Sequence, residues 1–302
     1  VDAAPWRGRA GVEAVAIDLG AEGARAALDA ALDGVDAVIH AAAGSGGDKA
    51  HARGTVAATE TLIAAMTARP APPRLTLVSS FSVYGYAAMP GWAQVDETTP
   101  LEPDPALRDA YCRAKLAQEA LARRAAQRDG LRVRALRPGA IVGPERMRTA
   151  RLGFAFGPLL VAPGGDAPIP LIDVADCAAL VIRAAETDPE QTDFPAISGD
   201  GRFEAINLVG VDQPAQSEFA RRLRADGWPR AAIRVPLRLA RAPAQAIALA
   251  SLVIPGLARR APAPLRLEAF DARFKPLRFS RARAEDRLGA EPDASGLEEV
   301  VA

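Results

Sequence analysis

One tyrosine and one lysine of the sequence, Tyr111 and Lys115, stand four residues apart in a stretch that reads as a helix. Side chains with this spacing share one helix face, so the ammonium group lies close to the phenol. A phenol titrates at about pH 10, and a nearby cation lowers its pKa by favouring the charged form. Such a tyrosine exchanges protons near neutral pH, as a general acid and base at a hydroxyl or carbonyl carbon must do.

Chance does not readily produce this pair, because both residue types are rare in the chain. There are three tyrosines and three lysines against 34 arginines, and random placement gives one such pair with a probability of about 0.03. A lysine where the composition favours arginine indicates that a compact ammonium is needed, since the two cations are not interchangeable. The alternative is a solvated helix that carries an unrelated tyrosine and lysine.

The elements around the pair alternate between strands and helices. The expected strands are 12–19, 35–40, 75–78 and 131–136, and the expected helices are 21–32, 55–68 and 110–128. This alternation is typical of βαβ units, in which parallel strands form a doubly wound α/β sheet. Ligands bind beyond the carboxyl ends of such strands, and the segment 86–108, rich in proline and acidic residues, is expected as a loop over those ends.

The length of 302 residues predicts two lobes. A nucleotide-binding lobe is expected over residues 1–145, with 171–187 returning to it, and a smaller substrate lobe over most of 146–302. Within the second lobe, 203–208 is strand-like, whereas 216–224 and 237–257 read as helices.

Composition excludes several classes of function. Acidic and basic residues both number 37, so no basic excess indicates a nucleic-acid partner. The two cysteines, Cys112 and Cys177, predict neither a metal site nor a disulfide framework, and a reduced, cytoplasmic protein is expected. Arginines and a proline interrupt the most apolar stretch, 237–257, so neither a membrane span nor a membrane partner is expected.

Short motifs follow one another along nearly the whole chain. They are Asp18-Leu19 after a strand, Val38 to Ala43, Ser79 to Gly85, Glu97 to Pro100, Tyr111 to Lys115 with Glu119, Arg137-Pro138 with Gly143-Pro144, Ile172 to Asp176, and Leu288 to Pro292. In this order they resemble the extended short-chain dehydrogenase/reductases, also called the NAD-dependent epimerase/dehydratase family. The resemblance implies a Rossmann-like fold and an NAD(P)-dependent oxidoreductase or epimerase.

The resemblance also implies roles for individual residues. Tyr111 would be the general acid and base, Lys115 would lower its pKa and bind the nicotinamide ribose, and Ser80 would donate to the substrate oxygen. Ser82 is the other candidate for the role of Ser80. The remaining cofactor contacts would come from Asp18 and Leu19 at the adenine, Ala41, Ala42 and Ala43 along the dinucleotide, and Pro138, Gly139, Ala140 and Ile141 at the carboxamide.

The sequence departs from the family pattern at the phosphate loop. The family opens with a strand, a Gly-x-x-Gly-x-x-Gly turn and a helix, and no such run occurs here. We therefore expect an N-terminal truncation, with one βα unit of about 30 residues preceding Val1. If Asp2 ends the second strand, it would bind the adenosine ribose and favour NAD, whereas Arg7 or Arg9 in that role would favour NADP. A protein that only binds the cofactor is the alternative class.

Two reactions remain open. Dehydratases of the family place acids directly after the catalytic hydroxyl, and Phe81 and Ser82 stand there instead, which disfavours dehydration. Hydride transfer at an alcohol carbon remains, once as in a dehydrogenase or twice as in a nucleotide-sugar 4-epimerase. The apolar character of 146–170 and 235–283 favours a dehydrogenase for a hydrophobic, 3β-hydroxysteroid-like alcohol. A small-molecule substrate is thus expected, and an alanine-rich catalytic helix is compatible with a homodimer.

Neither histidine is assigned a catalytic role, and His40 is interpreted as structural. His40 ends a strand, where a lone histidine is more often structural than catalytic, and His51 lies in a polar helix lead-in without an identifiable partner. Thr55, further along that helix, stands where the family commonly has the asparagine of its proton-relay network.

Overall fold

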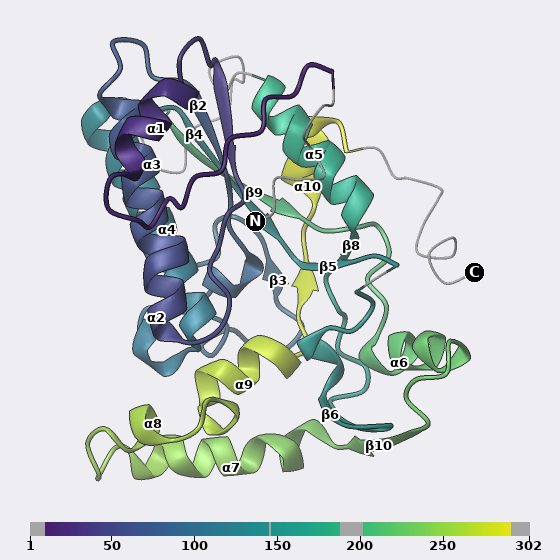
Figure 1. The fold of residues 1–302 in the computed structure, drawn as a ribbon. Helices are drawn as coiled ribbons and strands as arrows, with labels where there is room; N and C mark the ends of the chain where they lie inside the picture. Colours follow the sequence, from purple (N-terminus) through teal and green to yellow (C-terminus); the bar gives the residue numbers. More distant parts are fainter. Residues whose placement is uncertain (1–9, 145, 188–201, 291–302) are drawn as a thin grey trace.

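The computed structural model describes residues 10–144, 146–187 and 202–290 (Figure 1). Its centre is a sheet of four parallel strands in the order β1-β2-β4-β9. These strands are Ala37–His40, Arg74–Val78, Val133–Pro138 and Phe203–Leu208. Because β1, β2 and β4 are neighbours and run in one direction, their carboxyl ends lie side by side at one edge of the sheet.

Helices cover both faces of this sheet, as Figure 1 shows. On one face lie α1 (Ala24–Ala31), α3 (Ala58–Thr67) and α4 (Ala110–Asp129), which share a buried core with the strands. On the other face lie α5 (Val174–Glu186) and α10 (Ala282–Leu288), with a second core around Leu136 and Ile206. The predicted doubly wound parallel α/β fold is confirmed.

The helix after β1 changes its winding along its length. It begins as α2 (Asp48–His51), continues as the π-helical η2 (Ala52–Ala57), and becomes α3. The predicted helix 55–68 therefore starts earlier than expected. The backbone N–H of Gly44 donates to the Thr55 hydroxyl at 2.9 Å, which attaches the loop after β1 to the π segment. Such π turns are frequent at functional sites.

The predicted helix 110–128 is confirmed as α4, whose ends follow from its sequence. The Asp109 side chain accepts from the backbone N–H of Cys112 at 2.9 Å and caps the first turn. Gly130 ends the helix with a φ of 68°, a left-handed conformation that glycine adopts without steric cost. Alanines on its inner face are buried against the sheet core.

One predicted strand is wrong. Residues 12–19 form no regular secondary structure, although Ile17 and Leu19 pack against the core that contains α1. A strand needs a neighbour to satisfy its backbone groups, and β1, at the edge of the sheet that the structure describes, is paired with β2 alone. Ile17 and Leu19 are therefore only partly buried, Val12 and Val15 remain exposed, and the segment has no ladder of hydrogen bonds.

The substrate lobe is built from short strands and four helices among the described residues. Its strands are β5 (Ala140–Val142), β6 (Phe154–Phe156), β7 (Leu159–Pro163), β8 (Leu171–Asp173) and β10 (Ala231–Val235), in a sheet β10-β7-β6 and a pair β5-β8. Its helices are α6 (Gln216–Ala225), α7 (Leu237–Ala250), α8 (Leu257–Arg260) and α9 (Leu267–Phe274). A further pair, β3 (Gln94–Val95) with β11 (Arg278–Phe279), connects the lobes.

The chain crosses between the lobes more often than the predicted boundary at residue 145 implies. Helix α5 packs against the large sheet, β9 is one of its strands, and α10 contacts β9. The stretch 237–257, expected as one helix, is broken between α7 and α8, where Pro255 has no N–H to donate and Gly256 has a φ of 79°. None of the helices that the structure describes is long and apolar enough to cross a membrane.

Candidate active site

The predicted catalytic hydroxyls meet at the carboxyl edge of the sheet. Ser80 follows β2, Tyr111 lies in the first turn of α4, and the Ser80 hydroxyl is close enough to the phenol to lower its pKa. The Tyr111 side chain is 39% exposed, so a substrate can reach the phenol. The alternative candidate, Ser82, has a buried hydroxyl that finds no partner among the described residues. The structure therefore favours Ser80 over Ser82 as the partner of Tyr111.

Lys115 lies one turn beyond Tyr111 and is 3% exposed. Its Nζ donates to the Val78 carbonyl at 2.7 Å and to Gln118 Oε1 at 2.9 Å, and lies 6.0 Å from the centre of the Tyr111 ring. Burial lowers the pKa of Lys115 to about 8, against the opposing effect of Glu119. The ammonium is therefore fixed beneath the site, between the strand end and α4.

The pKa of Tyr111 does not follow the sequence prediction. Burial raises it above its ordinary value, while the Ser80 hydroxyl and the Arg146 charge lower it by less. Lys115 was expected to lower this pKa; its ammonium is hydrogen bonded to Val78 and Gln118 and lies 6.0 Å from the centre of the Tyr111 ring. At neutral pH the phenol is consequently protonated and ready to donate a proton.

A buried polar network continues from Lys115 into the protein. Gln118 Nε2 donates to Thr59 Oγ1 at 2.8 Å, and Thr59 donates to the Thr55 carbonyl at 2.7 Å. His40 Nε2 lies 2.8 Å from the same hydroxyl, which has already given its hydrogen, so the imidazole must be the donor. Burial lowers the pKa of His40 to about 4, with a smaller effect of the Lys115 charge. His40 is thus a neutral residue that helps to fix the support of Lys115.

His51 is the site residue that the sequence reasoning missed. It is 6% exposed, and its ring meets the Tyr111 ring edge-on, with centroids 5.8 Å apart and planes at 64°. Its Nδ1 is buried and has no hydrogen-bond partner within the described part of the chain. The sequence feature that could have predicted this position is the place of His51 on the helix after β1, because such helices begin at the ligand-binding edge of the sheet.

The residues predicted to lie along the dinucleotide and at the carboxamide reach the same edge. Ala41, Ala42 and Ala43 are exposed directly after β1, and their methyl groups leave the backbone open to a close approach. Gly139 joins β4 to β5, where an added Cβ would lie 2.2 Å from the Pro170 carbonyl oxygen. The residues after it, Ala140 and Ile141, are partly exposed beside the site, whereas Pro138 is buried in β4. These small and apolar groups fit a flat heteroaromatic ring.

The residues predicted at the adenine half are arranged differently. The Asp18 carboxylate is paired with Arg53 of η2 and accepts from the Gly20 N–H at 3.1 Å. Leu19 is half-buried against the core. Asp2 lies outside the described residues, so its contact with the adenosine ribose stays a prediction, as do those of Asp18 and Leu19.

A buried ion pair holds the catalytic helix to the sheet. Arg137 of β4 binds Glu119 of α4 through Nε–Oε1 at 2.9 Å and Nη2–Oε2 at 2.7 Å, and Ser79 donates to the same carboxylate. Arg137 also donates to the Tyr84 hydroxyl at 3.0 Å, which donates to Asn207 of β9 at 2.6 Å. Four segments are thereby fixed together. Because these contacts fix α4 against the sheet, they also fix the position of Tyr111, which lies on α4.

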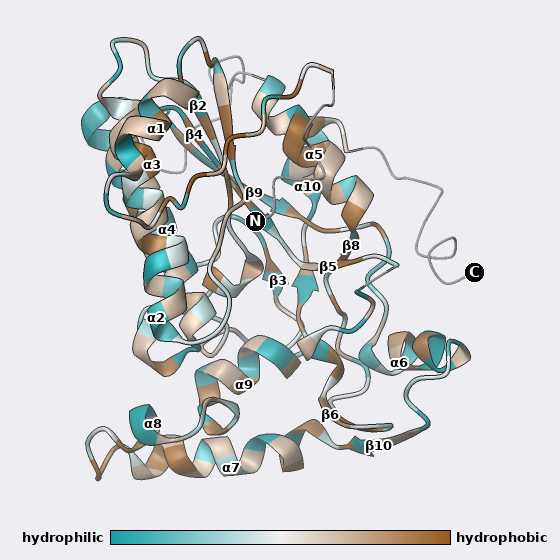
Figure 2. Cartoon of the chain, viewed as in Figure 1, coloured by the Kyte–Doolittle hydropathy of each residue, from teal (hydrophilic) through white to brown (hydrophobic). Residues whose placement is uncertain are grey.

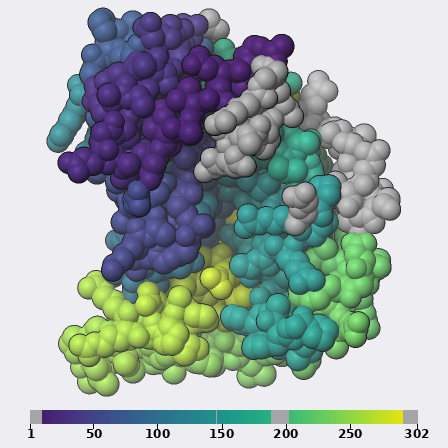
Figure 3. Space-filling view, viewed as in Figure 1, coloured from purple at the N-terminus to yellow at the C-terminus, as the bar shows by residue number. Residues whose placement is uncertain are grey.

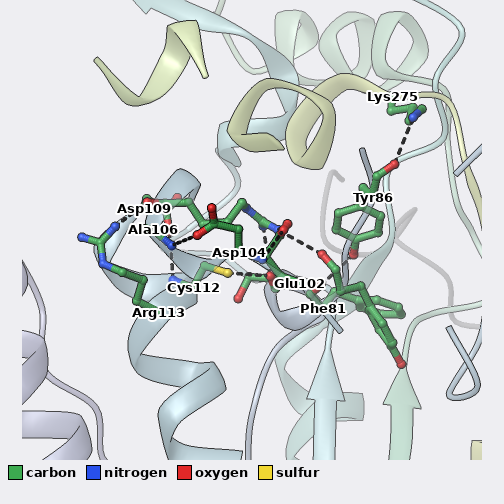
Figure 4. Close-up of polar contacts among 12 residues, drawn as sticks. Phe81, Tyr86, Glu102, Asp104, Ala106, Asp109, Cys112, Arg113 and Lys275 are labelled. Atoms are coloured by element: carbon green, nitrogen blue, oxygen red, sulfur yellow. Dashed lines mark hydrogen bonds and ion pairs between the residues drawn. The ribbon is translucent and has the colours of Figure 1, made fainter. Parts of the chain in front are cut away.

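A second buried pair fixes the segment before α4, as Figure 4 shows around Glu102 and Cys112. Arg108 donates to Glu102 at 3.0 Å and to the carbonyls of Ser82 and Tyr84, both at 2.9 Å. The Cys112 thiol donates to the Ser82 carbonyl at 3.0 Å, and burial raises its pKa to about 12. Cys112 therefore stabilises the loop after Ser80 and is not a nucleophile.

Comparison with known sequences identifies the class of protein. The sequence model of the NAD dependent epimerase/dehydratase family matches residues 3–195, which is more than half of the chain. The chain belongs to this family, and the prediction of an extended short-chain dehydrogenase-type enzyme is confirmed. Among curated proteins, no sequence matches it significantly.

Solved structures support the same fold. The UDP-glucuronic acid 4-epimerase of Bacillus cereus, crystallised with UDP-glucuronic acid and NAD, is 17% identical, with a TM-score of 0.60 over 91% of this chain and 75% of that one. The dTDP-glucose 4,6-dehydratase DesIV of Streptomyces venezuelae, a double mutant with NAD bound, is 20% identical, with a TM-score of 0.63 over 99% and 81%. RMD of Pseudomonas aeruginosa, complexed with NADPH, is 19% identical, with a TM-score of 0.59 over 95% and 85%. At these identities the likeness establishes the fold.

Proposed function

We propose that the protein catalyses NAD-dependent hydride transfer at a secondary alcohol carbon of a nucleotide sugar, as a 4-epimerase. The observation that carries the chemistry is the contact between Ser80 and the partly exposed phenol of Tyr111, with Lys115 fixed beneath them. These groups come from two separate segments and converge where the sheet of this family binds its ligands.

Each of these residues has a defined task in the reaction. NAD, when bound, accepts the hydride from the alcohol carbon and returns it. In the oxidation the alcohol proton passes to the Tyr111 phenolate as the carbon loses its hydride and becomes a carbonyl, and in the reverse step the phenol returns that proton to the ketone oxygen. Ser80 donates a hydrogen bond to the oxygen on which charge develops. Because burial keeps Tyr111 protonated, the described site favours the step in which the phenol donates to a ketone.

The substrate class rests on the surroundings of Tyr111. The positive charge of Arg146 acts on Tyr111, and its guanidinium is exposed; guanidinium groups bind phosphate and carboxylate well. The structurally similar proteins named above include one crystallised with UDP-glucuronic acid and NAD. We propose that Arg146 contacts the anionic part of a nucleotide sugar.

The expected preference for a hydrophobic alcohol has no support. Leu152 and Leu160, which suggested an apolar substrate wall, are buried in the core of the lobe itself. Phe154 packs on Phe274, with ring centroids 5.4 Å apart. Packing within the lobe therefore accounts for Leu152, Phe154 and Leu160, whereas Phe156 is 63% exposed.

The surroundings of Ser80 also bear on dehydration. Phe81, which follows the catalytic hydroxyl, is buried against Phe279 with centroids 5.3 Å apart. Ser82, the next residue, carries no carboxylate. Neither residue supplies a base for abstracting a second proton, which supports hydride transfer without loss of water.

Product analysis tests the proposal. The chain is incubated with NAD and either UDP-glucose or UDP-glucuronic acid, the NADH absorbance is followed, and the sugar is identified by NMR. A 4-epimerase gives the 4-epimer without net NADH, whereas a dehydrogenase accumulates NADH. Turnover of sterol-like alcohols alone would reverse the substrate assignment.

The Tyr111→Phe variant separates catalysis from binding. We expect turnover to fall by about 10²–10⁴-fold, because the proton donor is lost. Cofactor affinity, measured by calorimetry, should change less than about twofold, because the aromatic ring remains. Undiminished turnover would remove Tyr111 from the mechanism. NAD binding by the native chain without turnover of either sugar nucleotide would indicate a cofactor-binding protein instead of an enzyme.

A further inference from the structure

The outward face of α7 is apolar, which is unusual for a helix exposed to solvent. Leu239 and Leu249 are each 67% exposed, and alanines and a proline lie between them on the same side. The turn that follows continues this face, with Leu252 at 82%, Val253 at 83% and Ile254 at 52% exposure. Large aliphatic side chains gathered at one place on a surface mark an interaction site. We call residues 237–260 the α7–α8 hairpin.

The hairpin is packed on its inner side and closed by hydrogen bonds at its turn. The inner side of α7 is packed around Ala244, which is buried with Phe270 and Phe274 of α9. The Ser251 hydroxyl donates to the Ile247 carbonyl at 2.8 Å and accepts from the Ala258 N–H at 2.9 Å, which closes the turn. The outward leucines are consequently not the result of a poorly packed helix. They are held in the solvent by the packing of the opposite face.

The same region carries only positive charge. Residues 227–267 contain seven arginines and no aspartate or glutamate, in a chain whose acidic and basic residues are equal in number. Among the described residues Arg234, Arg238 and Arg260 are exposed and make no ion pair, whereas the exposed Arg259 binds Asp104 at 3.0 Å. Cationic and aliphatic side chains are therefore presented together.

The shape of this surface favours a flat partner. In Figure 1, α7 lies along the lower edge of the molecule, and the turn to α8 projects beyond the remaining elements. Figure 2 shows apolar residues along α7 and in that turn, and Figure 3 shows the hairpin at the lower margin of the surface. A projecting edge cannot enclose a small ligand. It can enter the boundary between the headgroups and acyl chains of a bilayer.

We propose that the α7–α8 hairpin docks on an anionic lipid surface, with Leu249, Leu252 and Val253 inserted at the headgroup level. The exposed arginines beside them would bind phosphate groups of acidic lipids, as basic amphipathic segments do. This is contact with one leaflet and needs no membrane-spanning helix. It revises the sequence expectation that the protein has no membrane partner, and it does not depend on the reaction catalysed.

Vesicle co-sedimentation of the full chain tests the docking. We expect binding to vesicles of phosphatidylcholine with about a third phosphatidylglycerol, and loss of most binding at high salt, because the phosphate contacts are screened. The double variant Leu252→Asp with Val253→Asp should lower the bound fraction about tenfold, because charged groups resist insertion. The variant Arg238→Gln with Arg260→Gln should bind less at low salt.

A matched pair of variants controls for general effects of a new charge. Ile254 in the hairpin and Ile182 on the distant α5 are both 52% exposed. Ile254→Asp should weaken vesicle binding, whereas Ile182→Asp should not, and circular dichroism establishes that both remain folded. Equal loss in both, equal binding to pure phosphatidylcholine, or no binding to any vesicle would overturn the proposal. Self-association that Leu252→Asp abolishes, without vesicle binding, would assign the hairpin to a second copy of this chain.

Discussion

The contact between α4 and β4 and the α7–α8 hairpin use charged and apolar residues in opposite ways. Between α4 and β4, Arg137 and Glu119 are buried, and both guanidinium and carboxylate are satisfied by hydrogen bonds. In the hairpin, arginines and leucines of the outer face are left in solvent. The first arrangement fixes α4, which carries Tyr111, against the sheet. The second contributes little to folding and is available to a partner.

The difference explains why the two regions should respond differently to mutation. A buried ion pair adds little net stability, but removal of one member leaves an uncompensated charge in the interior. An exposed pair or an exposed leucine is already solvated, so its loss changes the free energy of unfolding only slightly. The largest losses should therefore come from α4 and β4, and the smallest from the outer face of α7.

The largest effect is expected for Glu119→Ala. This change leaves the Arg137 guanidinium buried without its carboxylate, and we expect the free energy of unfolding to fall by about 3–5 kcal/mol. The matched control is Glu218→Ala, which removes an exposed partner of Arg222 and should cost less than about 1 kcal/mol. Urea unfolding measures both. Similar losses in the two variants would break the comparison between buried and exposed charge.

The buried ammonium of Lys115 predicts a pH dependence of stability. Its pKa is about 8 in the folded chain and about 10.4 when unfolded. Between these values the unfolded chain binds more protons, so stability rises with pH over this window and is lost again as pH falls through 8. Relative to Lys115→Met, the native chain should gain about 3 kcal/mol from pH 8 to pH 10.4. Parallel unfolding curves for the two proteins would contradict this prediction.

A smaller effect is expected at His51, whose buried ring lies edge-on to Tyr111. His51→Phe keeps an aromatic ring at this position and removes Nδ1, which has no other partner among the described residues. We expect kcat to fall about tenfold, with KM and cofactor affinity nearly unchanged, if the imidazole positions or reprotonates Tyr111. His51→Gln, which retains polar atoms, should recover part of the rate. A parallel loss of stability would assign His51 a packing role only.

The smallest effect is expected on the outer face of α7. Leu249→Gln should change the free energy of unfolding by less than about 0.5 kcal/mol, because this side chain is already in solvent. Leu160→Ala, in the core of the same lobe, should cost about 2–5 kcal/mol. Thermal unfolding of the two variants compares them directly. A large loss for Leu249→Gln would show that the hairpin is needed for folding.

The order of motifs was sufficient to predict the parallel sheet and the helix that carries Tyr111, and the structure places Ser80 near that tyrosine. This succeeded because a strand that ends in serines and a helix with Tyr-x-x-x-Lys place their side chains by local geometry. The strand at 12–19 failed because pairing depends on a neighbour and not on the pattern of the segment itself. The apolar segment 146–170 was read as a substrate wall because composition does not reveal which side chains a lobe buries within itself.

The sequence by itself determined the family, the class of fold and the residues that can exchange a proton, since these follow from spacing along single elements. Only the tertiary structure decided the electrostatics of the site. Burial lowers the pKa of Lys115 and partial burial raises that of Tyr111, because segments distant in the sequence pack around both groups. The tertiary structure also placed His51 against Tyr111 and left the leucines of α7 in solvent, because both results depend on which faces of the elements meet.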